Sequence, residues 1–588
     1  MLDRIEKAVQ EAVQSEYGEE FAPEVFPTEN PAHGHYSTNV AMKLAKARNG
    51  DPMRIAEGIK CKVEGIKLFE RVEVAAPGFI NFWLSKEALE GELTTILEHG
   101  ERYGRGDALK DKKIIVEYTD PNPFKEFHIG HLYTNMIGES LARLFEAQGA
   151  DVRRANYQGD VGIHVAKAIW GMKQKLEIRN EKLKDLEAQP LKERINFMGQ
   201  AYAAGATAFE EDETVKQEIT DLNKKIYDLD TDVQELYQKG RAWSLEYFET
   251  IYRRLGTKFD FYYFESEVGQ IGLALVKENI QKGIFEESEG AIVFPGEKYG
   301  LHRRVFVNSR GLPTYEAKDL GLVSIKYKDF PYDASVSVTG NEITDYFKVI
   351  IAALRQIHPD LARKIKHIAH GMVRFAEGKM SSRTGNVVTA EGLLDEVKKR
   401  ARLRMASAVT NASADRSDGQ ARSILPEQEK EEVLEAVTIG AVKYAFLKSR
   451  VGQDIVFDPD RSLDLKGDSG PYLQYAYARL SSVMSKSGEA PPKTIDLGML
   501  EKGEEERLIR QLMYFPETVG RAAELYEPNI VAEYLYKLAN AANSFYEHAP
   551  ILKAEEHVKE NRLALAVATM AVLKSGLRLL GMQAPERM

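Results

Sequence analysis

The stretch from residue 114 to residue 157 constrains the fold of this chain most strongly. It begins with Ile114-Ile115-Val116, a short apolar run that predicts a buried strand. Two prolines follow, so we expect an extended turn. From His128 the apolar residues have helical spacing, and Gly149 is a candidate C-cap. Because residues 152–157 again look like a strand, the order strand, helix, strand predicts a parallel sheet with a right-handed crossover.

Two histidines and a glycine lie where the turn passes into this helix, namely His128, Gly130 and His131. Free backbone N–H groups and the helix dipole at a helix N-terminus favour a phosphate. Ligands of parallel sheets also bind beyond the carboxyl ends of the strands. We therefore predict a nucleotide site here. The alternative is a His-x-x-His metal pair, which needs further ligands in a chain whose only cysteine is Cys61.

The length of 588 residues predicts several domains, because it exceeds what one core can organise. We expect a small α+β unit at residues 1–105 and an α/β unit with the parallel sheet at 106–390. Residues 391–588 look almost entirely helical, with linker composition at 411–418.

The α/β unit is interrupted by an insertion at about residues 171–300. Its first part is rich in charged residues at helical spacing, which predicts helices with solvated faces and no further function. Strand-like pieces follow at 259–264 and 291–294, and we expect the sheet to resume near 304–307.

Composition indicates a cytoplasmic protein. No apolar run reaches the roughly 18 residues that a membrane span needs, and the charged first residues do not resemble a signal peptide. A single cysteine excludes disulfides within the chain. The net charge of −10 argues weakly against coating by nucleic acid, but it leaves room for a local basic track.

A second motif makes the histidine motif more specific. His128-Ile129-Gly130-His131 is followed some 250 residues later by Lys379-Met380-Ser381-Ser382-Arg383. A His-x-Gly-His sequence is weak alone, but the pair, in this order, resembles the signature motifs of class I aminoacyl-tRNA synthetases. Other stretches are similar to the arginyl-tRNA synthetase family, and they are residues 36–39, 77–82, 159–162, 314–321, 381–388 and 580–588. The resemblance covers the whole chain except the insertion.

The resemblance implies a Rossmann-like catalytic domain, a small N-terminal α+β domain that binds tRNA, and a C-terminal helical domain that binds the anticodon. It implies that arginine carboxylate attacks the α-phosphate of ATP, and that the 2′-hydroxyl of the terminal adenosine of tRNA then takes the arginyl group. Both steps depend on positioning and cationic stabilisation. ATP is expected with Mg²⁺ as its counter-ion, without a metal site on the protein, and the family suggests a monomer.

The same resemblance assigns roles to individual residues. His128, His131, Lys379 and Lys125 are expected to be catalytic. The residues expected at ATP are Gly130, Gly340, Glu342, Met372, Val373, Met380, Ser381 and Ser382. Those expected to contact tRNA are Tyr36 and Asn39 at the elbow, and Tyr472, Gln474 and Tyr475 at the anticodon. The alternative for Tyr36 and Asn39 is that their loop only forms a turn. A second group of aromatic residues, at 534–546, fits a helical core.

Five residues are expected to bind arginine: Glu117, Asn122, Asp160, Tyr315 and Asp319. A guanidinium group prefers planar, charge-assisted acceptors. Tyr315 and Asp319 are four residues apart and therefore share a helical face. Asp160 is expected at the α-amino group. The alternative is that Glu117 and Asp319 are only surface charges.

The sequence departs from the family pattern at two places. The second lysine of the class I loop is replaced by Ser382, and Lys125, three residues before His128, is expected to compensate. After the strand that ends at Gly340 the family usually has an acidic residue and a glutamine. Here these positions are Glu342, which can still reach the ATP ribose, and Ile343.

Two other functions remain open at this point. A catalytically silent relative that only binds tRNA would tolerate Ile343, but not explain the intact His128, His131, Lys125 and Lys379. A cysteinyl enzyme of the same class would want zinc-binding cysteines, which a single Cys61 cannot supply.

Overall fold

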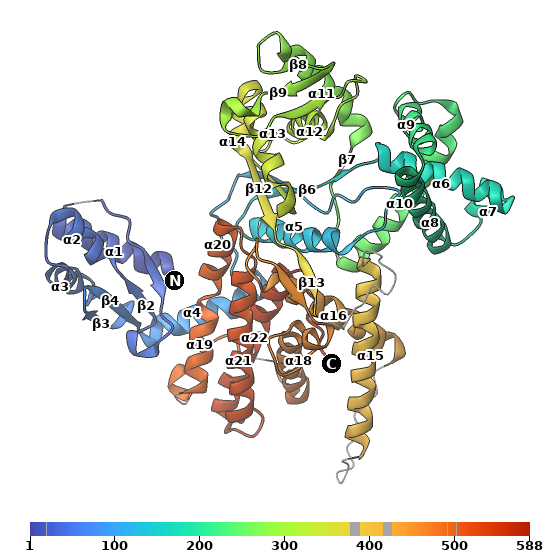
Figure 1. Ribbon diagram of the computed structural model, residues 1–588. Coiled ribbons are helices and arrows are strands. Elements are labelled where there is room, and N and C mark those ends of the chain that lie inside the picture. Colours follow the sequence, from blue (N-terminus) through green and yellow to red (C-terminus); the bar gives the residue numbers. More distant parts are fainter. Residues whose placement is uncertain (19, 377–388, 415–425, 491, 501–502) are drawn as a thin grey trace.

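The computed structural model describes the 588 residues except 19, 377–388, 415–425, 491 and 501–502. In Figure 1 the N-terminal unit lies at the left, and the helices of the insertion lie at the right. The parallel sheet lies between them, above the C-terminal helices. Among the described residues, no helix has the length and apolarity to cross a membrane.

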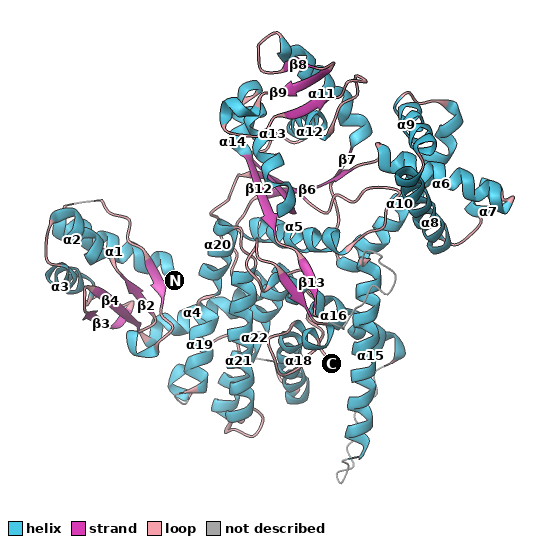
Figure 2. Cartoon of the chain, viewed as in Figure 1, coloured by secondary structure: helices cyan, strands magenta, loops and turns pink. Residues whose placement is uncertain are grey.

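A five-stranded parallel sheet forms the centre of the chain (Figure 2). Its strands, in spatial order, are β12 (Ile365–His370), β11 (Ala334–Gly340), β5 (Lys113–Glu117), β6 (Asp151–Gln158) and β7 (Phe261–Phe264). Ile114 of β5 pairs with Ala334 on one side and with Val152 on the other. The predicted buried strand is therefore confirmed, and it lies in the middle of the sheet.

Successive residues of β5 enter two different cores, because side chains alternate across a strand. Ile115 packs with α11 (Glu265–Ile280) and α12 (Tyr315–Asp329) on one face. Ile114 and Val116 join the large core on the other face. That core contains α5 (Ile129–Ala147), and the sheet is thus covered on both faces, as a parallel sheet requires.

The helix α5 begins where the sequence predicts, with His128 as its N-cap. Its end differs by one residue from the prediction, because Gln148 is the C-cap. Gly149 follows with φ 89°, a conformation that favours glycine.

The insertion is helical up to residue 255, as expected. Its helices are α6 (Ile163–Arg179), α7 (Leu183–Glu187), α8 (Leu191–Glu211), α9 (Glu213–Tyr227) and α10 (Thr231–Leu255). They enclose a core of their own.

The strands that follow the helices of the insertion differ from the prediction. β7 joins the main sheet, whereas β10 (Arg304–Val307) pairs antiparallel with β9 (Ala291–Phe294), and β9 pairs with β8 (Glu286–Ser288). The prediction that the sheet resumes at residues 304–307 is therefore wrong. Neighbouring antiparallel strands need only short connections, whereas a return to the parallel sheet needs a crossover, which α12 provides before β11.

The helices around the carboxyl half of the α/β unit include two further elements. These are α13 (Thr344–Ile357), which follows β11, and α14 (Pro359–Lys364), which leads into β12. A small parallel pair, β13 (Val373–Phe375) and β14 (Ile455–Phe457), joins this unit to the C-terminal helices.

The N-terminal unit is a small antiparallel sheet with helices. The strands are β1 (Val25–Pro27), β2 (Tyr36–Thr38), β3 (Phe69–Ala75) and β4 (Phe79–Leu84). The helices are α1 (Leu2–Tyr17), α2 (Val40–Arg48) and α3 (Pro52–Val63), and α4 (Lys86–His99) leads on toward the rest of the chain. The predicted strand after Pro77-Gly78 is confirmed as β4.

The C-terminal part is helical, as predicted. Its helices are α15 (Ala390–Ala414), α16 (Glu427–Leu447), α17 (Pro459–Ser462), α18 (Gly470–Ser487), α19 (Glu504–Met513), α20 (Phe515–Leu525), α21 (Asn529–His548) and α22 (Glu556–Leu579). Of the linker expected at 411–418, residues 411–414 belong to α15, and residues 415–418 lie outside the described residues.

Gly171 of α6 and Gly205 of α8 let these two helices cross closely. This crossing yields a prediction about stability. A Cβ added at Gly205 would collide with the backbone carbonyl of Lys167. We expect Gly205→Ala to destabilise the insertion by about 2 kcal/mol, because two backbones must separate. Hydrogen exchange of residues 163–211 measures the loss as faster local opening.

The matched control is Gly91→Ala in α4, where an added Cβ meets no atom within 4 Å. Alanine there should stabilise the helix by about 0.5–1 kcal/mol. Unchanged exchange in α8 of the Gly205 variant would contradict the close crossing.

Candidate active site

The carboxyl ends of β5, β6 and β11 surround the N-terminus of α5, as the parallel topology predicts. The turn between β5 and α5 brings the two halves of the site together. Its early residues lie beside a cluster of acidic side chains, which we call the acidic pocket and which comprises Glu117, Asp120, Asp160, Glu265 and Asp319. Its last residues form the histidine pair.

The turn is strained. Thr119, Asp120 and Phe124 have φ values of 82°, 47° and 68°, although none of them is glycine. A left-handed conformation is unusual for such residues and costs on the order of 1–3 kcal/mol each. The prediction of an extended turn is therefore wrong at these positions.

Hydrogen bonds from three other elements hold the strained turn. Asn135 of α5 donates from Nδ2 to Thr119 Oγ1 at 2.9 Å. The backbone N–H of Tyr157 in β6 donates to Asp120 Oδ1 at 2.8 Å. Ser244 of α10 accepts the Phe124 N–H at 2.9 Å. The conformation is thus imposed by tertiary contacts, which local sequence signals do not reveal.

The histidine pair closes the turn and caps α5. The Gly130 N–H donates to His128 Nδ1 at 3.1 Å, and the His128 N–H donates to His131 Nδ1 at 3.3 Å. The two rings stack with 3.6 Å between their centroids. Because each Nδ1 accepts a hydrogen bond, the proton of each neutral ring belongs on Nε2. Burial lowers the pKa of both imidazoles and favours this neutral form.

Both Nε2–H groups are therefore available as neutral donors at a helix N-terminus. This arrangement suits phosphate oxygens better than a metal ion, because a metal needs an unprotonated imidazole nitrogen.

Lys125 lies beside the histidine pair, and its charge helps to lower the pKa of both rings. Its Nζ is 5.5 Å from the ring centroid of Tyr202 in α8. Among the described residues, no carboxylate lies within ion-pair distance of this ammonium group. Burial and then Lys167 lower the pKa of Lys125. Lys125 is thus a cation without a protein counter-ion next to the candidate phosphate site.

Other residues predicted for the nucleotide lie around this point. The Glu342 carboxylate lies against Gly340, where a Cβ would collide with it, and its charge acts on His128. The backbone N–H of Met372 donates to Asp454 Oδ1 at 2.8 Å, and Val373 begins β13. Lys379, Met380, Ser381 and Ser382 lie outside the described residues.

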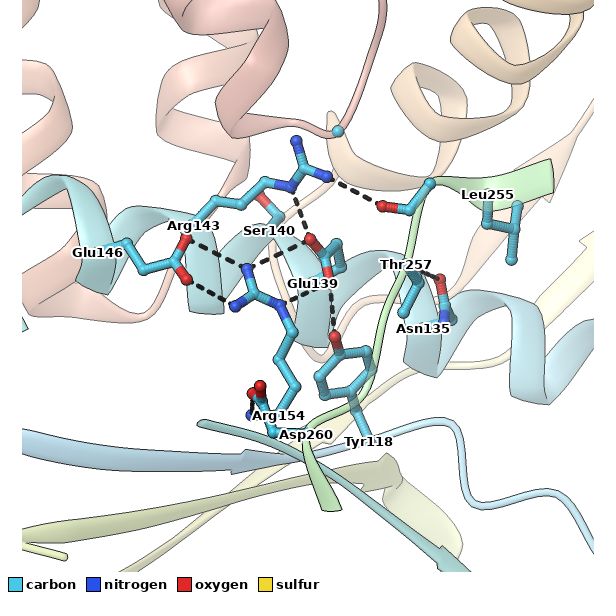
Figure 3. Close-up of polar contacts among 12 residues, drawn as sticks. Tyr118, Asn135, Glu139, Ser140, Arg143, Glu146, Arg154, Leu255, Thr257 and Asp260 are labelled. Carbon is cyan, nitrogen blue, oxygen red and sulfur yellow. Dashed lines mark hydrogen bonds and ion pairs between the residues drawn. The ribbon is translucent and has the colours of Figure 1, made fainter. Parts of the chain in front are cut away.

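A buried charge cluster fixes the far side of α5 to the sheet (Figure 3). Glu139 accepts hydrogen bonds from Tyr118 Oη at 2.6 Å, from Arg143 Nε at 2.7 Å and from Arg154 Nε at 3.0 Å. Burial alone would raise the pKa of Glu139, but the two arginines hold it below its usual value. The helix that carries the histidines is thereby locked to β5 and β6.

Two predicted arginine ligands are already occupied. Glu117 is 5% exposed, and its Oε2 lies 2.6 Å from Lys326 Nζ. Asp160 is fully buried and accepts four hydrogen bonds, from Arg241, Tyr237 and the N–H and Oγ of Ser266.

These two residues correct the expectations drawn from the sequence. Asp160 has no accessible oxygen for an α-amino group, and Glu117 is not a surface charge. Asp160 instead holds neighbouring elements together. Glu117 pairs with Lys326 through Oε2, but among the described residues no hydrogen-bond donor lies on its Oε1, so its predicted contact with arginine stays a prediction.

The remaining predicted ligands have open polar atoms. Asp319 accepts a hydrogen bond from Tyr346 Oη at 2.6 Å. Burial raises the pKa of Asp319 to about 7 despite this bond. Asn122 Oδ1 lies where a Cβ of Gly159 would be, so only glycine fits there. Tyr315 is 56% exposed at the start of α12, on the same side of the helix as Asp319.

Two lysines and a glutamate of this pocket escaped the sequence analysis. Lys318 Nζ lies 2.5 Å from Glu265 Oε2, and both side chains are buried. Lys318, Leu322 and Lys326 are spaced four residues apart, so the two lysines share the buried face of α12 with a leucine. Lysines on an apolar helical face are a signal for buried acidic partners.

Two of the predicted tRNA contacts are inaccessible in this structure. Tyr36 is fully buried, and its hydroxyl donates to Glu517 of α20 at 2.9 Å. Gln474 is also fully buried, and its amide donates to the carbonyls of Ala436 and Gln583 at 2.9 Å each. Their polar groups join the N-terminal unit and the C-terminal segment to the helical part, which corrects the expected direct contacts.

The other three residues lie nearer the surface. Tyr472 is half-buried and donates to Asn540 at 2.6 Å. The guanidinium carbon of Arg479 is 4.6 Å from the ring centroid of Tyr475. Asn39 is partly exposed, although its Oδ1 is buried and has no hydrogen-bond partner among the described residues. These positions remain compatible with the predicted contacts.

Comparisons with known protein families agree along the chain. The family described as "tRNA synthetases class I (R), catalytic domain" matches residues 92–459. The family described as "DALR anticodon binding domain" matches residues 473–588. The family described as "Arginyl tRNA synthetase N terminal domain" matches residues 2–84.

Individual relatives give the same result. The arginine–tRNA ligase of Fusobacterium nucleatum is 31% identical over 566 residues, which are 95% of this chain and 94% of the relative. That of Clostridium kluyveri is 33% identical over 563 residues, again 95% and 94%. The structure of Thermus thermophilus arginyl-tRNA synthetase superposes with a TM-score of 0.80 at 25% identity and covers 100% of both chains.

The buried pair of Glu117 and Lys326 yields a prediction. We expect Glu117→Gln to lower the free energy of unfolding by about 3–5 kcal/mol, because Lys326 is left buried without a counter-ion. The double variant Glu117→Gln, Lys326→Met should recover much of this loss. Calorimetric unfolding of the three chains gives the coupling between the two residues.

A different result would restore the expectation from the sequence. If Glu117→Gln unfolds like the wild type and only weakens binding of a cationic ligand, Glu117 is a ligand contact and not a structural partner of Lys326.

Proposed function

The chain belongs to the arginyl-tRNA synthetase family of class I aminoacyl-tRNA synthetases, and we propose that it joins arginine to tRNA with ATP. The arginine carboxylate attacks the α-phosphate of ATP, a P–O bond breaks, and pyrophosphate leaves. The 2′-hydroxyl of the terminal adenosine of tRNA then attacks the arginyl carbonyl, and AMP leaves. The observation that carries this proposal is the placement of an acidic pocket next to two neutral imidazole donors.

For ATP, we propose that the Nε2–H groups of His128 and His131 donate to phosphate oxygens at the start of α5. Lys125 is the nearest described cation without a protein counter-ion, so its charge is available to the phosphates. Glu342 accepts hydrogen bonds from the ribose hydroxyls. Its carboxylate lies against Gly340, whose lack of a side chain leaves room for it.

Further nucleotide contacts belong to this proposal. Gly130 allows adenine to approach, and Met372 and Val373 line its far side. Outside the described residues, Lys379 supplies a second positive charge, and Met380, Ser381 and Ser382 accompany it.

For arginine, we propose that the guanidinium group lies against Asp319 and Tyr315, with Asn122 nearer the reacting carboxylate. Glu117 and Asp160 act by holding β5, α10 and α12 in place around the substrate. A site built from carboxylates rejects neutral side chains, because their binding would leave buried charges uncompensated.

For tRNA, we propose that residues 1–105 contact the elbow through Asn39, and that residues 391–588 contact the anticodon through Tyr472 and Tyr475. Residues 106–390 carry the chemistry. Tyrosine faces stack on bases of any sequence, and phosphate contacts make such binding salt-dependent.

We further propose that the chain works as a monomer in the cytoplasm, and that Mg²⁺ enters with ATP as its counter-ion. Mg²⁺ neutralises phosphate charge when it is bound. Among the described residues, no group of three or more His, Cys, Asp or Glu side chains is placed to hold a metal ion.

One assay tests the proposed function. Aminoacylation is measured with arginine, ATP and bulk tRNA, and with other amino acids in place of arginine. Charging with arginine supports the proposal. Charging with a different amino acid contradicts the specificity, and no charging at all favours a silent tRNA-binding relative.

We expect Lys125→Ala to lower adenylate formation by about 10²–10³-fold, because it removes a cation from the transferred phosphate. ATP–pyrophosphate exchange in the presence of tRNA measures this step, and the affinity for tRNA should change little. The control is Lys167→Ala, whose ammonium group already pairs with Glu210 at 3.2 Å. If the Lys125 variant exchanges pyrophosphate at the wild-type rate, Lys125 does not compensate for the lysine that is missing at position 382.

The raised pKa of Asp319, about 7, predicts a pH dependence. Below this pH the free enzyme holds Asp319 protonated, whereas a guanidinium group binds the ionised form. We therefore expect the KM for arginine to rise about tenfold per unit as the pH falls below 7, and to level off above it. Steady-state charging between pH 5.5 and 8 measures this. Asp319→Asn should have a high KM whose dependence on pH is weaker than in the wild type, and an unchanged slope in that variant would disprove the assignment.

A further inference from the structure

Asp120 is a carboxylate in the pocket to which no role has been given. It lies in the strained turn directly after β5, with φ 47°. Its Oδ1 accepts the Tyr157 N–H at 2.8 Å. Among the described residues, no hydrogen-bond donor lies on Oδ2. Half of this partly buried carboxylate is therefore unpaired.

The charges around Asp120 do not balance. Glu117, Asp319 and Lys326 all act on it, and burial and then Glu117 raise its pKa well above the usual value. Lys326 already donates to Glu117 at 2.6 Å and to Ser335 Oγ at 3.0 Å. Three carboxylates thus share one lysine, and buried anions without cations are costly.

A second observation indicates that the pocket is incomplete. The hydroxyl of Tyr157 is buried and has no partner among the described residues. Burial and then the charges of Glu265 and Asp319 raise the pKa of this tyrosine, and Asp319 is one of the three carboxylates that share Lys326. The pocket therefore lacks both a cation and a hydrogen-bond partner.

We propose that Asp120 is a specificity-determining residue that accepts, through Oδ2, a hydrogen bond from the guanidinium group of the substrate arginine, together with Asp319. This rests on the proposed function. A guanidinium group carries one positive charge and five N–H donors in one plane, so it can reach two carboxylates at once. It supplies the missing charge that Lys326 does not. Asp120 thereby adds an acceptor to a site in which Ile343 stands at the position of the usual glutamine.

A purely structural role for Asp120 has an internal comparison. Asp260 also accepts a backbone N–H of β6, but outside the pocket: its Oδ2 accepts the Arg154 N–H at 2.8 Å (Figure 3). Asp260 is exposed. If Asp120 only braces β6, then Asp120→Asn and Asp260→Asn should behave alike.

The test compares these two variants with the wild type in charging assays. For Asp120→Asn we expect the KM for arginine to rise about 10- to 100-fold, the range for loss of a hydrogen bond between charged groups. The KM values for ATP and tRNA should stay within about twofold of the wild type. Asp260→Asn should leave all three unchanged.

Citrulline, the neutral analogue of arginine with the same shape, gives a second readout. The affinity for citrulline, relative to that for arginine, should be higher in Asp120→Asn than in the wild type, because a neutral ligand leaves one buried carboxylate fewer without a counter-ion. A structural defect would weaken both ligands equally. Asp120→Ser removes the same charge and supplies the comparison if the asparagine variant does not fold.

The outcomes separate the two proposals. A wild-type chain that does not charge tRNA with arginine overturns the proposed function. Wild-type charging with an unchanged arginine KM in Asp120→Asn, or an unchanged ratio of citrulline to arginine inhibition, overturns the role of Asp120 alone.

Discussion

The strained turn between β5 and α5 is the constraint on which the site depends. A chain that leaves the middle strand of the sheet must turn into a helix within eleven residues, 118–128. Thr119, Asp120 and Phe124 adopt left-handed conformations to do so. Bonds from Asn135 and Ser244 hold this geometry. The free energy lost to strain is offset by tertiary contacts, and the result is a rigid frame for Lys125 and the histidines that follow.

Charge balance is the second constraint, and it links the pocket to its substrate. Each buried carboxylate that braces the walls has its own cation: Lys326 for Glu117, Lys318 for Glu265 and Arg241 for Asp160. Asp120 and Asp319 have none among the described residues, and their pKa values are raised. The pocket therefore contains two kinds of carboxylate: those neutralised within the protein, and those without a cation, for which we propose that the ligand supplies the counter-ion.

The sequence predicted the parts that depend on local periodicity. The apolar run of β5 and the helical spacing after His128 were sufficient to place the strand, the helix and the histidine pair at the start of that helix. The amino-acid half depends on residues far apart in the sequence, such as Lys326 and Glu117, which are 209 residues apart. Local sequence patterns do not reveal such pairs. The same reason explains why the burial of Tyr36 was missed, since its partner Glu517 lies 481 residues away.

The insertion does more for the site than its charged surface suggests. Ser244 of α10 holds the strained turn, and Tyr237 and Arg241 of the same helix saturate Asp160. Tyr202 of α8 lies against Lys125. The exposed faces of these helices are solvated, as their composition predicts, but their inner faces set the position of the turn. Because Gly205 allows α8 to cross α6 closely and Tyr202 of α8 lies against Lys125, the packing of the insertion bears on the position of Lys125.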